Sequence, residues 1–168
     1  PISVRIECEL KTGGVSTGTG FFFNFLEDKL NNTYVPVVVT NKHVIKNASK
    51  GKLIITKAND KGEPIDTQHF TLAFDNFESF WRLHPEADVD LCAMPIAPFV
   101  NEAQKRGDKL FYIPFTKDIL LTDKHKDELT AIEDVLMIGY PNGIWDSVNN
   151  MPIFRKGTTA TNPLIDYN

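Results

Sequence analysis

Residues 1–97 alternate between short apolar segments and clusters of glycine, asparagine and proline. Several segments either alternate apolar with polar side chains or are rich in aromatic and β-branched residues, as is typical of β-strands. No long helical pattern separates these segments, which argues against a parallel α/β sheet. Short strands at this spacing favour an all-β barrel or sandwich. The pattern predicts strands over 4–10, 18–26, 34–40, 52–58, 69–74 and 90–96.

The pattern changes after residue 97. Residues 98–107 begin with a proline and end with a glycine, which suit the first position of a helix and the position just past its end. We therefore expect one short helix there, and then a charged, solvated stretch over 122–128. Two further strands are expected at 133–141 and 151–160. These signals divide the chain into a β unit (1–97), a connector with a short helix (98–130) and the beginning of a second β unit (131–168).

The second β unit is expected to be incomplete within this sequence. Two or three strands cannot close a barrel, and they would leave unpaired backbone edges of the kind that stable proteins cover. We therefore expect a further C-terminal segment, or a further domain on another chain, to complete this unit.

Composition narrows the classes of function. The chain has 168 residues, and its hydrophobic and charged contents of 42% and 24% are those of a globular domain. Its net charge of −4 argues against nucleic acid as the main partner, because nucleic acid selects basic surfaces. No apolar run reaches the roughly 18 residues of a membrane span. The two cysteines, Cys8 and Cys92, lie in strand segments and are expected to be buried free thiols. No signal peptide or disulfide pattern is visible, which favours the cytoplasm.

One histidine stands directly at the exit of a predicted strand. Three valines, 37–39, form an apolar run that Thr40, Asn41 and Lys42 interrupt, and His43 follows. A histidine in that place is either a hydrogen-bonded structural residue or a general base. A general base needs a partner that fixes its tautomer and stabilises the imidazolium, and a buried carboxylate does this best.

Asp90 is the candidate partner of His43. It opens the apolar strand 90–96, so we expect its carboxylate to be largely desolvated and therefore to need a partner. Asp88 is the competing choice, but it lies in the polar stretch PEADVD, for which a loop is expected. His43 and Asp90 are therefore the candidate catalytic residues.

Four segments occur in an order that carries a family resemblance: GTGFFF (18–23), VVVTNKHVI (37–45), DVDLCAMPI (88–96) and VLMIGYPNGI (135–144). In this order they resemble the trypsin-like, chymotrypsin-fold serine peptidases, especially the bacterial branch that includes the HtrA-type proteases. In that family a Gly-x-Gly-aromatic strand precedes a Thr-x-x-His-Val strand, an Asp-Leu-Ala-type strand and an Ile-Gly-x-Pro strand that opens the second barrel. The match spans about residues 4–160.

The resemblance implies a double β-barrel, of which the N-terminal barrel is complete and the C-terminal barrel only partly present. It implies a serine endopeptidase whose polypeptide substrate lies in a cleft between the barrels, with no metal or organic cofactor. His43 would be the general base and Asp90 its orienting carboxylate. The family's nucleophile is a serine in a Gly-x-Ser-Gly context, which no serine of this chain has. The resemblance therefore places the nucleophile outside this sequence.

Other patterns point to other functions. The GVSTG stretch around Ser16 fits the G-x-S-x-G nucleophile elbow, but an elbow needs a helix after it, and a strand is predicted here. His84, Asp88 and Asp90, together with His43, offer ligands for a divalent ion, but their spacing matches no standard metal motif. A protease fold without a functional serine would be a non-catalytic module that binds a peptide or a partner protein.

Overall fold

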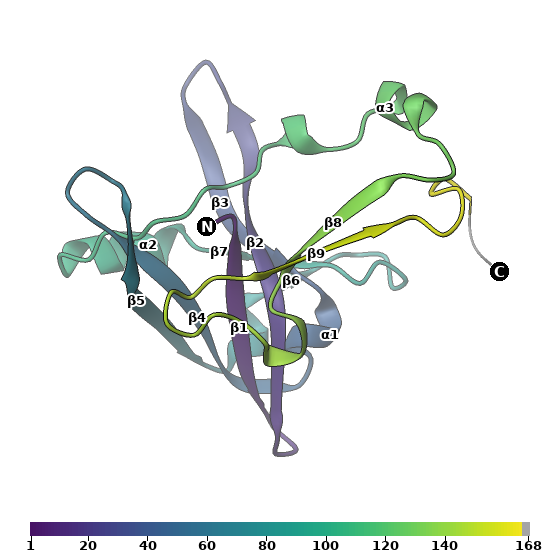
Figure 1. The fold of residues 1–168 in the computed structure, drawn as a ribbon. Helices are drawn as coiled ribbons and strands as arrows, with labels where there is room; N and C mark the ends of the chain where they lie inside the picture. The colour runs from purple at the N-terminus through teal and green to yellow at the C-terminus, as the bar shows by residue number, and fades with distance from the viewer. Residues whose placement is uncertain (166–168) are drawn as a thin grey trace.

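The computed structural model describes residues 1–165, and β-strands make up most of its regular structure (Figure 1). Seven strands of the described chain form one antiparallel sheet in the order β5-β4-β1-β2-β3-β7-β6, and two more form a separate hairpin. The prediction of a mainly β protein is confirmed. The last three residues of the predicted second unit, 131–168, lie outside the described residues. The strands are β1 (Ser3–Leu10), β2 (Val15–Asp28), β3 (Thr33–Thr40), β4 (Ala48–Ala58), β5 (Pro64–Asp75), β6 (Arg82–Leu83), β7 (Cys92–Pro95), β8 (Asp134–Gly139) and β9 (Ile153–Thr158).

The apolar run in β3 is buried because both faces of this central strand are covered. Val38 faces the main core, whereas Val37 and Val39 belong to a second, smaller cluster with Phe23. Phe115, from the connector that follows α2 (Ala97–Lys105), packs against this second cluster. A strand covered on both faces has no need of polar alternation, which explains why three consecutive valines fit here.

The main core is shared by strands from distant positions in the sheet order. Phe74 of β5 and Met94 of β7 belong to the same cluster, so the sheet must curve around it. In the described chain, however, β5 pairs only with β4 and β6 only with β7, and no closed barrel is detected. The expected closure of the N-terminal barrel by a hydrogen-bonded ladder is therefore not observed.

Aromatic side chains, not a backbone ladder, cover the core at the β5 edge. The ring of Phe74 lies 5.4 Å from that of Phe77 and 4.9 Å from that of Phe99, centroid to centroid. Phe77 belongs to the 3-10 helix η1 (Phe77–Phe80), and Phe99 belongs to α2. These two helices therefore pack against the edge strand β5 through their aromatic side chains.

The helix predicted over 98–107 is confirmed as α2. Pro98 lies in its first turn, and Gly107, just beyond its end, has φ of 87°. The predicted solvated stretch 122–128 is exposed and contains a short helix that the sequence did not predict, α3 (Asp123–Glu128). No helix in the described part of the chain combines the length and the apolar character required to cross a membrane. The remaining helices are α1 (Lys42–Ile45), η2 (Lys117–Ile119) and η3 (Pro141–Gly143).

The turn between β8 and β9 attaches the hairpin to the large sheet (Figure 1). The Tyr140 amide donates to Thr19 Oγ1 at 2.8 Å, and the Asn150 side chain donates to a backbone carbonyl of β4 at 3.0 Å. The Arg5 guanidinium of β1 lies under the Trp145 ring, with Cζ 3.3 Å from the ring centroid. Polar and cation–π contacts therefore join the hairpin turn to the sheet, and the Tyr140 side chain is buried there, at 1% exposure.

Candidate active site

His43 lies in α1, the single helical turn that begins just after β3 ends. Its neighbours Val44 and Ile45 are buried in the main core, so they fix the turn and leave the His43 side chain outside. The turn also depends on Gly18 of β2, because a Cβ at that position would lie only 2.5 Å from Val44 Cγ1. The first glycine of the GTG stretch thus allows α1 to approach the sheet. The His43 side chain is 72% exposed.

The pairing of β3 with β7 brings Asp90 to His43. The two strands are antiparallel, with Thr40 opposite Cys92 at the end of the ladder. Continuing that register by two residues places position 90 opposite position 42. His43 and Asp90 therefore leave two neighbouring strands at the same end of the sheet.

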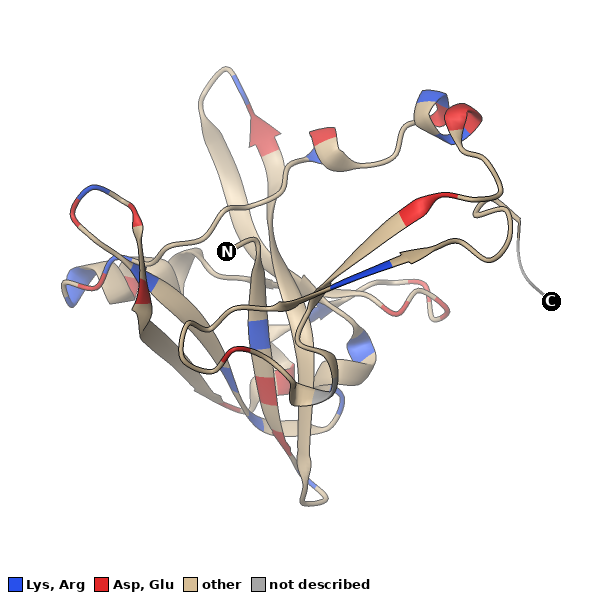
Figure 2. Cartoon of the chain, in the orientation of Figure 1, with Lys and Arg blue, Asp and Glu red and all other residues tan. Residues whose placement is uncertain are grey.

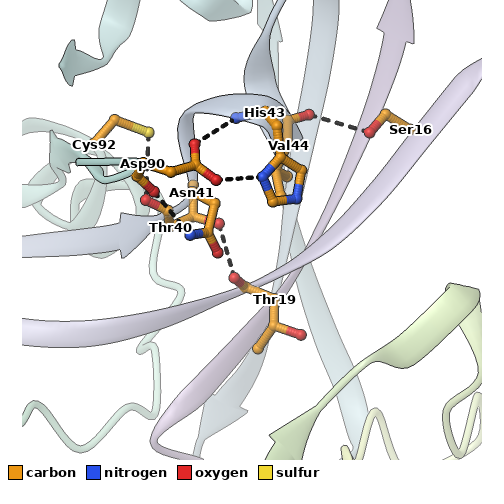
Figure 3. Close-up of polar contacts among 8 residues, drawn as sticks. All are labelled: Ser16, Thr19, Thr40, Asn41, His43, Val44, Asp90 and Cys92. Atoms are coloured by element: carbon orange, nitrogen blue, oxygen red, sulfur yellow. Dashed lines mark hydrogen bonds and ion pairs between the residues drawn. The ribbon is translucent and has the colours of Figure 1, made fainter. Parts of the chain in front are cut away.

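The imidazole and the carboxylate are in direct contact (Figure 3). His43 Nδ1 lies 2.5 Å from Asp90 Oδ2, and the His43 backbone N–H donates to Asp90 Oδ1 at 3.1 Å. The hydrogen bond from the His43 ring is the main reason why the pKa of Asp90 is below its ordinary value. Backbone N–H groups of His43 and Lys42 act in the same direction, and partial desolvation opposes them. The carboxylate is therefore ionised at neutral pH.

This arrangement determines the tautomer of the ring. An ionised carboxylate can only accept hydrogen bonds, so His43 must donate from Nδ1. The neutral ring then has its lone pair on Nε2. Because the side chain is largely exposed, a reacting group can approach His43, and the pair has the geometry that a general base requires.

The expectation that Asp90 is largely desolvated is wrong. Its side chain is 46% exposed, because β7 begins only at Cys92 and Asp90 still belongs to the surface loop that precedes the strand. Asp88 is exposed in the same loop, as predicted. The structure thus brings together the two residues that the sequence nominated, while their catalytic roles stay predictions.

The sequence did not predict two side chains that contact the backbone of the loop containing Asp90. Asn41 Nδ2 donates to the backbone oxygen of Asp90 at 2.7 Å, and Lys42 Nζ donates to that of Glu86 at 2.8 Å. Figure 2 shows the acidic residues of this β6–β7 loop in red and the blue lysine colouring at α1. The sequence signal for both contacts is only that Asn41 and Lys42 directly precede His43.

The other sequence candidates do not form alternative centres in the described residues. Ser16 lies inside β2 and donates to the backbone oxygen of Val44 at 3.2 Å, and the strand continues after it, as predicted. His84 Nδ1 accepts from the Glu86 amide at 3.3 Å. No group of three or more His, Cys, Asp or Glu side chains within residues 1–165 is placed to hold a metal ion.

The best-defined hollows in the described part of the chain lie away from the candidate site. Three of them have volumes of about 350, 350 and 470 Å³, and neither His43 nor Asp90 lines any of the three. The largest is lined by Lys11, Ala48, Asn76, Glu78 and Ser79. The substrate cleft that the resemblance implies is therefore not among them, and the exposed side of His43 faces solvent.

Comparison with known proteins adds no family to this description. No family model matches the sequence, and no curated protein matches it. The likeness to trypsin-like peptidases therefore stays a resemblance carried by four segments, and the geometry of His43 and Asp90 is the structural basis for a function.

Proposed function

We propose that this chain supplies the histidine and the aspartate of a trypsin-like serine endopeptidase. The observation that carries the proposal is the 2.5 Å contact between His43 Nδ1 and Asp90 Oδ2, made by a ring that is otherwise open to solvent. A core histidine would be enclosed, whereas an exposed ring whose Nδ1 is fixed by an ionised carboxylate is arranged for proton transfer at Nε2.

In this mechanism His43 Nε2 takes the proton of a serine hydroxyl as the oxygen attacks the peptide carbonyl. The imidazolium, stabilised by Asp90, then returns the proton to the leaving amine. The serine and the backbone N–H groups of the oxyanion hole would come from a segment outside this sequence. The polypeptide substrate would lie beside His43.

The finer fold assignment belongs to the same proposal. The seven-stranded sheet, curved around one core, would be the N-terminal barrel of a double-barrel peptidase. The β8–β9 hairpin would be the first part of the C-terminal barrel. The support for this is the shared core of β5 and β7 and the anchoring of the hairpin turn on β1, β2 and β4.

The test uses the whole natural protein that contains this chain. We expect it to hydrolyse fluorescent casein and to react with a fluorophosphonate probe, which labels activated serines. His43→Ala should lower kcat by about 10⁴-fold or more and abolish labelling, because the serine then has no base. The melting temperature should be almost unchanged, because the lost side chain is exposed.

His125→Ala is the matched control, since His125 is an exposed histidine of α3, remote in sequence from the pair. It should retain full hydrolysis and labelling. If His43→Ala hydrolyses casein as fast as the wild type, the proposal is wrong. If the wild type neither hydrolyses casein nor reacts with the probe, a non-catalytic peptide- or protein-binding module becomes the better assignment.

A further inference from the structure

Asn41 occupies a position at which asparagine normally caps a helix. It is the N-cap residue of α1, with an extended backbone at φ −83° and ψ 145°. Asparagine is favoured there because its side-chain oxygen accepts an N–H of the first turn. The Asn41 side chain makes no such hydrogen bond. Its amide instead donates to the backbone oxygen of Asp90, 49 residues away in the sequence, at 2.7 Å.

Asp90 takes over the capping role that Asn41 leaves open. Its Oδ1 accepts the N–H of His43, the second residue of α1, at 3.1 Å. The two segments therefore exchange partners: the side chain of Asn41 holds the backbone of Asp90, and the side chain of Asp90 holds the backbone of His43 (Figure 3). This reciprocity resembles a capping box, but it joins two segments that are far apart in sequence.

The β-ladder does not fix Asp90 by itself. The pairing of β3 with β7 ends at Thr40 and Cys92, two residues short of Asp90. The loop that contains Asp90 is closed at its base by a hydrogen bond from the His84 amide to the Leu91 oxygen, at 2.8 Å. In the described chain, the Asn41 amide is the side-chain donor that reaches the backbone of Asp90 itself.

From this geometry we propose that Asn41 is a positioning residue, whose amide holds Asp90 where its carboxylate can accept the Nδ1–H of His43. The inference rests on the proposed function, in which His43 and Asp90 form the proton-transfer pair. Asn41 has no contact with a reacting atom in this role. It acts only through Asp90.

Two substitutions separate positioning from a general structural role. Asn41→Ala removes the donor. Asn41→Asp keeps the shape and remains a good N-cap, but a carboxylate cannot donate to the Asp90 oxygen. A residue needed only to begin α1 would tolerate aspartate, whereas a positioning residue would not. Lys42→Met is the matched control, because it removes the other side-chain contact to the same loop, at Glu86.

The readout is NMR of the 168-residue chain with ¹⁵N-labelled histidine and ¹³C-labelled aspartate. In the wild type and in Lys42→Met we expect the His43 ring at pH 8 to be held as the Nδ1–H tautomer, and the pKa of Asp90 to stay below its ordinary value. In Asn41→Ala we expect the ring to adopt the tautomer mixture of a free imidazole. The pKa of Asp90 should then rise toward its ordinary value. Asn41→Asp should lose the fixed tautomer in the same way.

The melting temperature of each variant is measured to check that it is folded. In the complete protein, Asn41→Ala should lower kcat by about 10²-fold with little change in KM, as expected for a misplaced catalytic group. The proposal is overturned if both Asn41 variants keep the wild-type tautomer, or if Lys42→Met loses it equally. The NMR result does not depend on hydrolysis. Displacement of Asp90 in a protein that cleaves nothing would therefore support the positioning role and contradict only the proposed function.

Discussion

The seven-stranded sheet and the β8–β9 hairpin are both antiparallel, but their side chains have different surroundings. In β1 the alternate residues Val4, Ile6 and Cys8 point into the main core, and residues from β2, β3, β4, β5 and β7 join them there. In β8 the apolar residues 135–137 are all exposed, and so is Phe154 of β9, which pairs with Ile138. A two-stranded ribbon with little buried surface is marginally stable alone. The hairpin therefore depends on its attachment to the sheet.

This difference determines what positions the candidate site. His43 is fixed by the burial of Val44 and Ile45, and Asp90 by the ladder between β3 and β7 and the contact from Asn41. All of these belong to the sheet side of the molecule. We therefore expect the His43–Asp90 contact to respond to damage in the core and to be insensitive to changes in the hairpin.

The largest expected difference in stability is between removing a buried aromatic ring from the core of the sheet and removing an exposed one from the hairpin. Phe77 is 0% exposed, and it fills the space that the missing Cβ of Gly51 leaves open. Phe77→Ala should lower the free energy of unfolding by about 3–5 kcal/mol, because it leaves a cavity in the core. Phe154 is 66% exposed, so Phe154→Ala should change it by less than about 0.5 kcal/mol. Urea unfolding followed by circular dichroism measures both, and equal losses would mean that the hairpin is as well packed as the sheet.

A smaller effect is expected where the hairpin meets the sheet. A Cβ at Gly139 would lie 2.5 Å from Thr19 Oγ1, which already accepts the Tyr140 amide. Gly139→Ala should therefore force this contact apart, at a cost of about 1–3 kcal/mol. Gly157, on the partner strand, has nothing within 4 Å of its Cβ position. Gly157→Ala should be neutral or stabilise by up to about 1 kcal/mol.

Native-state hydrogen exchange of the Tyr140 amide provides the measurement for these two glycines. Exchange should become faster in Gly139→Ala and stay unchanged in Gly157→Ala, because only the first substitution opens the attachment. The His43 tautomer should be the same in both variants. A change of tautomer in Gly139→Ala would show that the hairpin helps to position the site, contrary to the comparison.

Local pattern predicted the strands well, because alternation and apolar runs reflect which face of a strand is buried. The largest boundary error was in β5, which begins at Pro64 and not near 69. Residues 64–68 are mostly polar, and only Pro64 and Ile65 of this stretch pair with β4, beyond an irregularity between Thr56 and Lys57. The turn α1 was missed because tertiary burial of Val44 and Ile45 defines it, and four residues carry no helical period.

The sequence nominated His43 and Asp90, but it could not supply their geometry. Their contact depends on the register of β3 against β7, which pairs residues about 50 positions apart. For the same reason the role of Asn41 was not visible, since its partner lies in another part of the chain. The exposure of Asp90 was misjudged because β7 begins two residues later than predicted.

The smallest expected change in stability comes from placing a reporter thiol in the hairpin. Met137 is 62% exposed, so Met137→Cys should alter the free energy of unfolding by less than about 0.5 kcal/mol. Cys8 and Cys92 are buried free thiols, and burial raises the pKa of each to about 12. At pH 8 both therefore remain protonated, and their thiolate fractions increase only as the pH approaches 12. A thiol-reactive dye should label the new cysteine on the order of 10³ times faster than either native one.

Wild-type protein unfolded in guanidinium is the control for this labelling, since both native thiols should then react rapidly. The two native cysteines differ in their distance from Asp90 along the chain. Cys92 is two residues from Asp90 and donates to the backbone oxygen of Thr40 at 3.5 Å, whereas Cys8 lies in β1. If Cys92 alone reacted as fast as the reporter, the end of the sheet that positions Asp90 would open independently of the core. The candidate site would then be as mobile as we expect the hairpin to be. This result would contradict the conclusion that the well-packed sheet holds His43 and Asp90 in place.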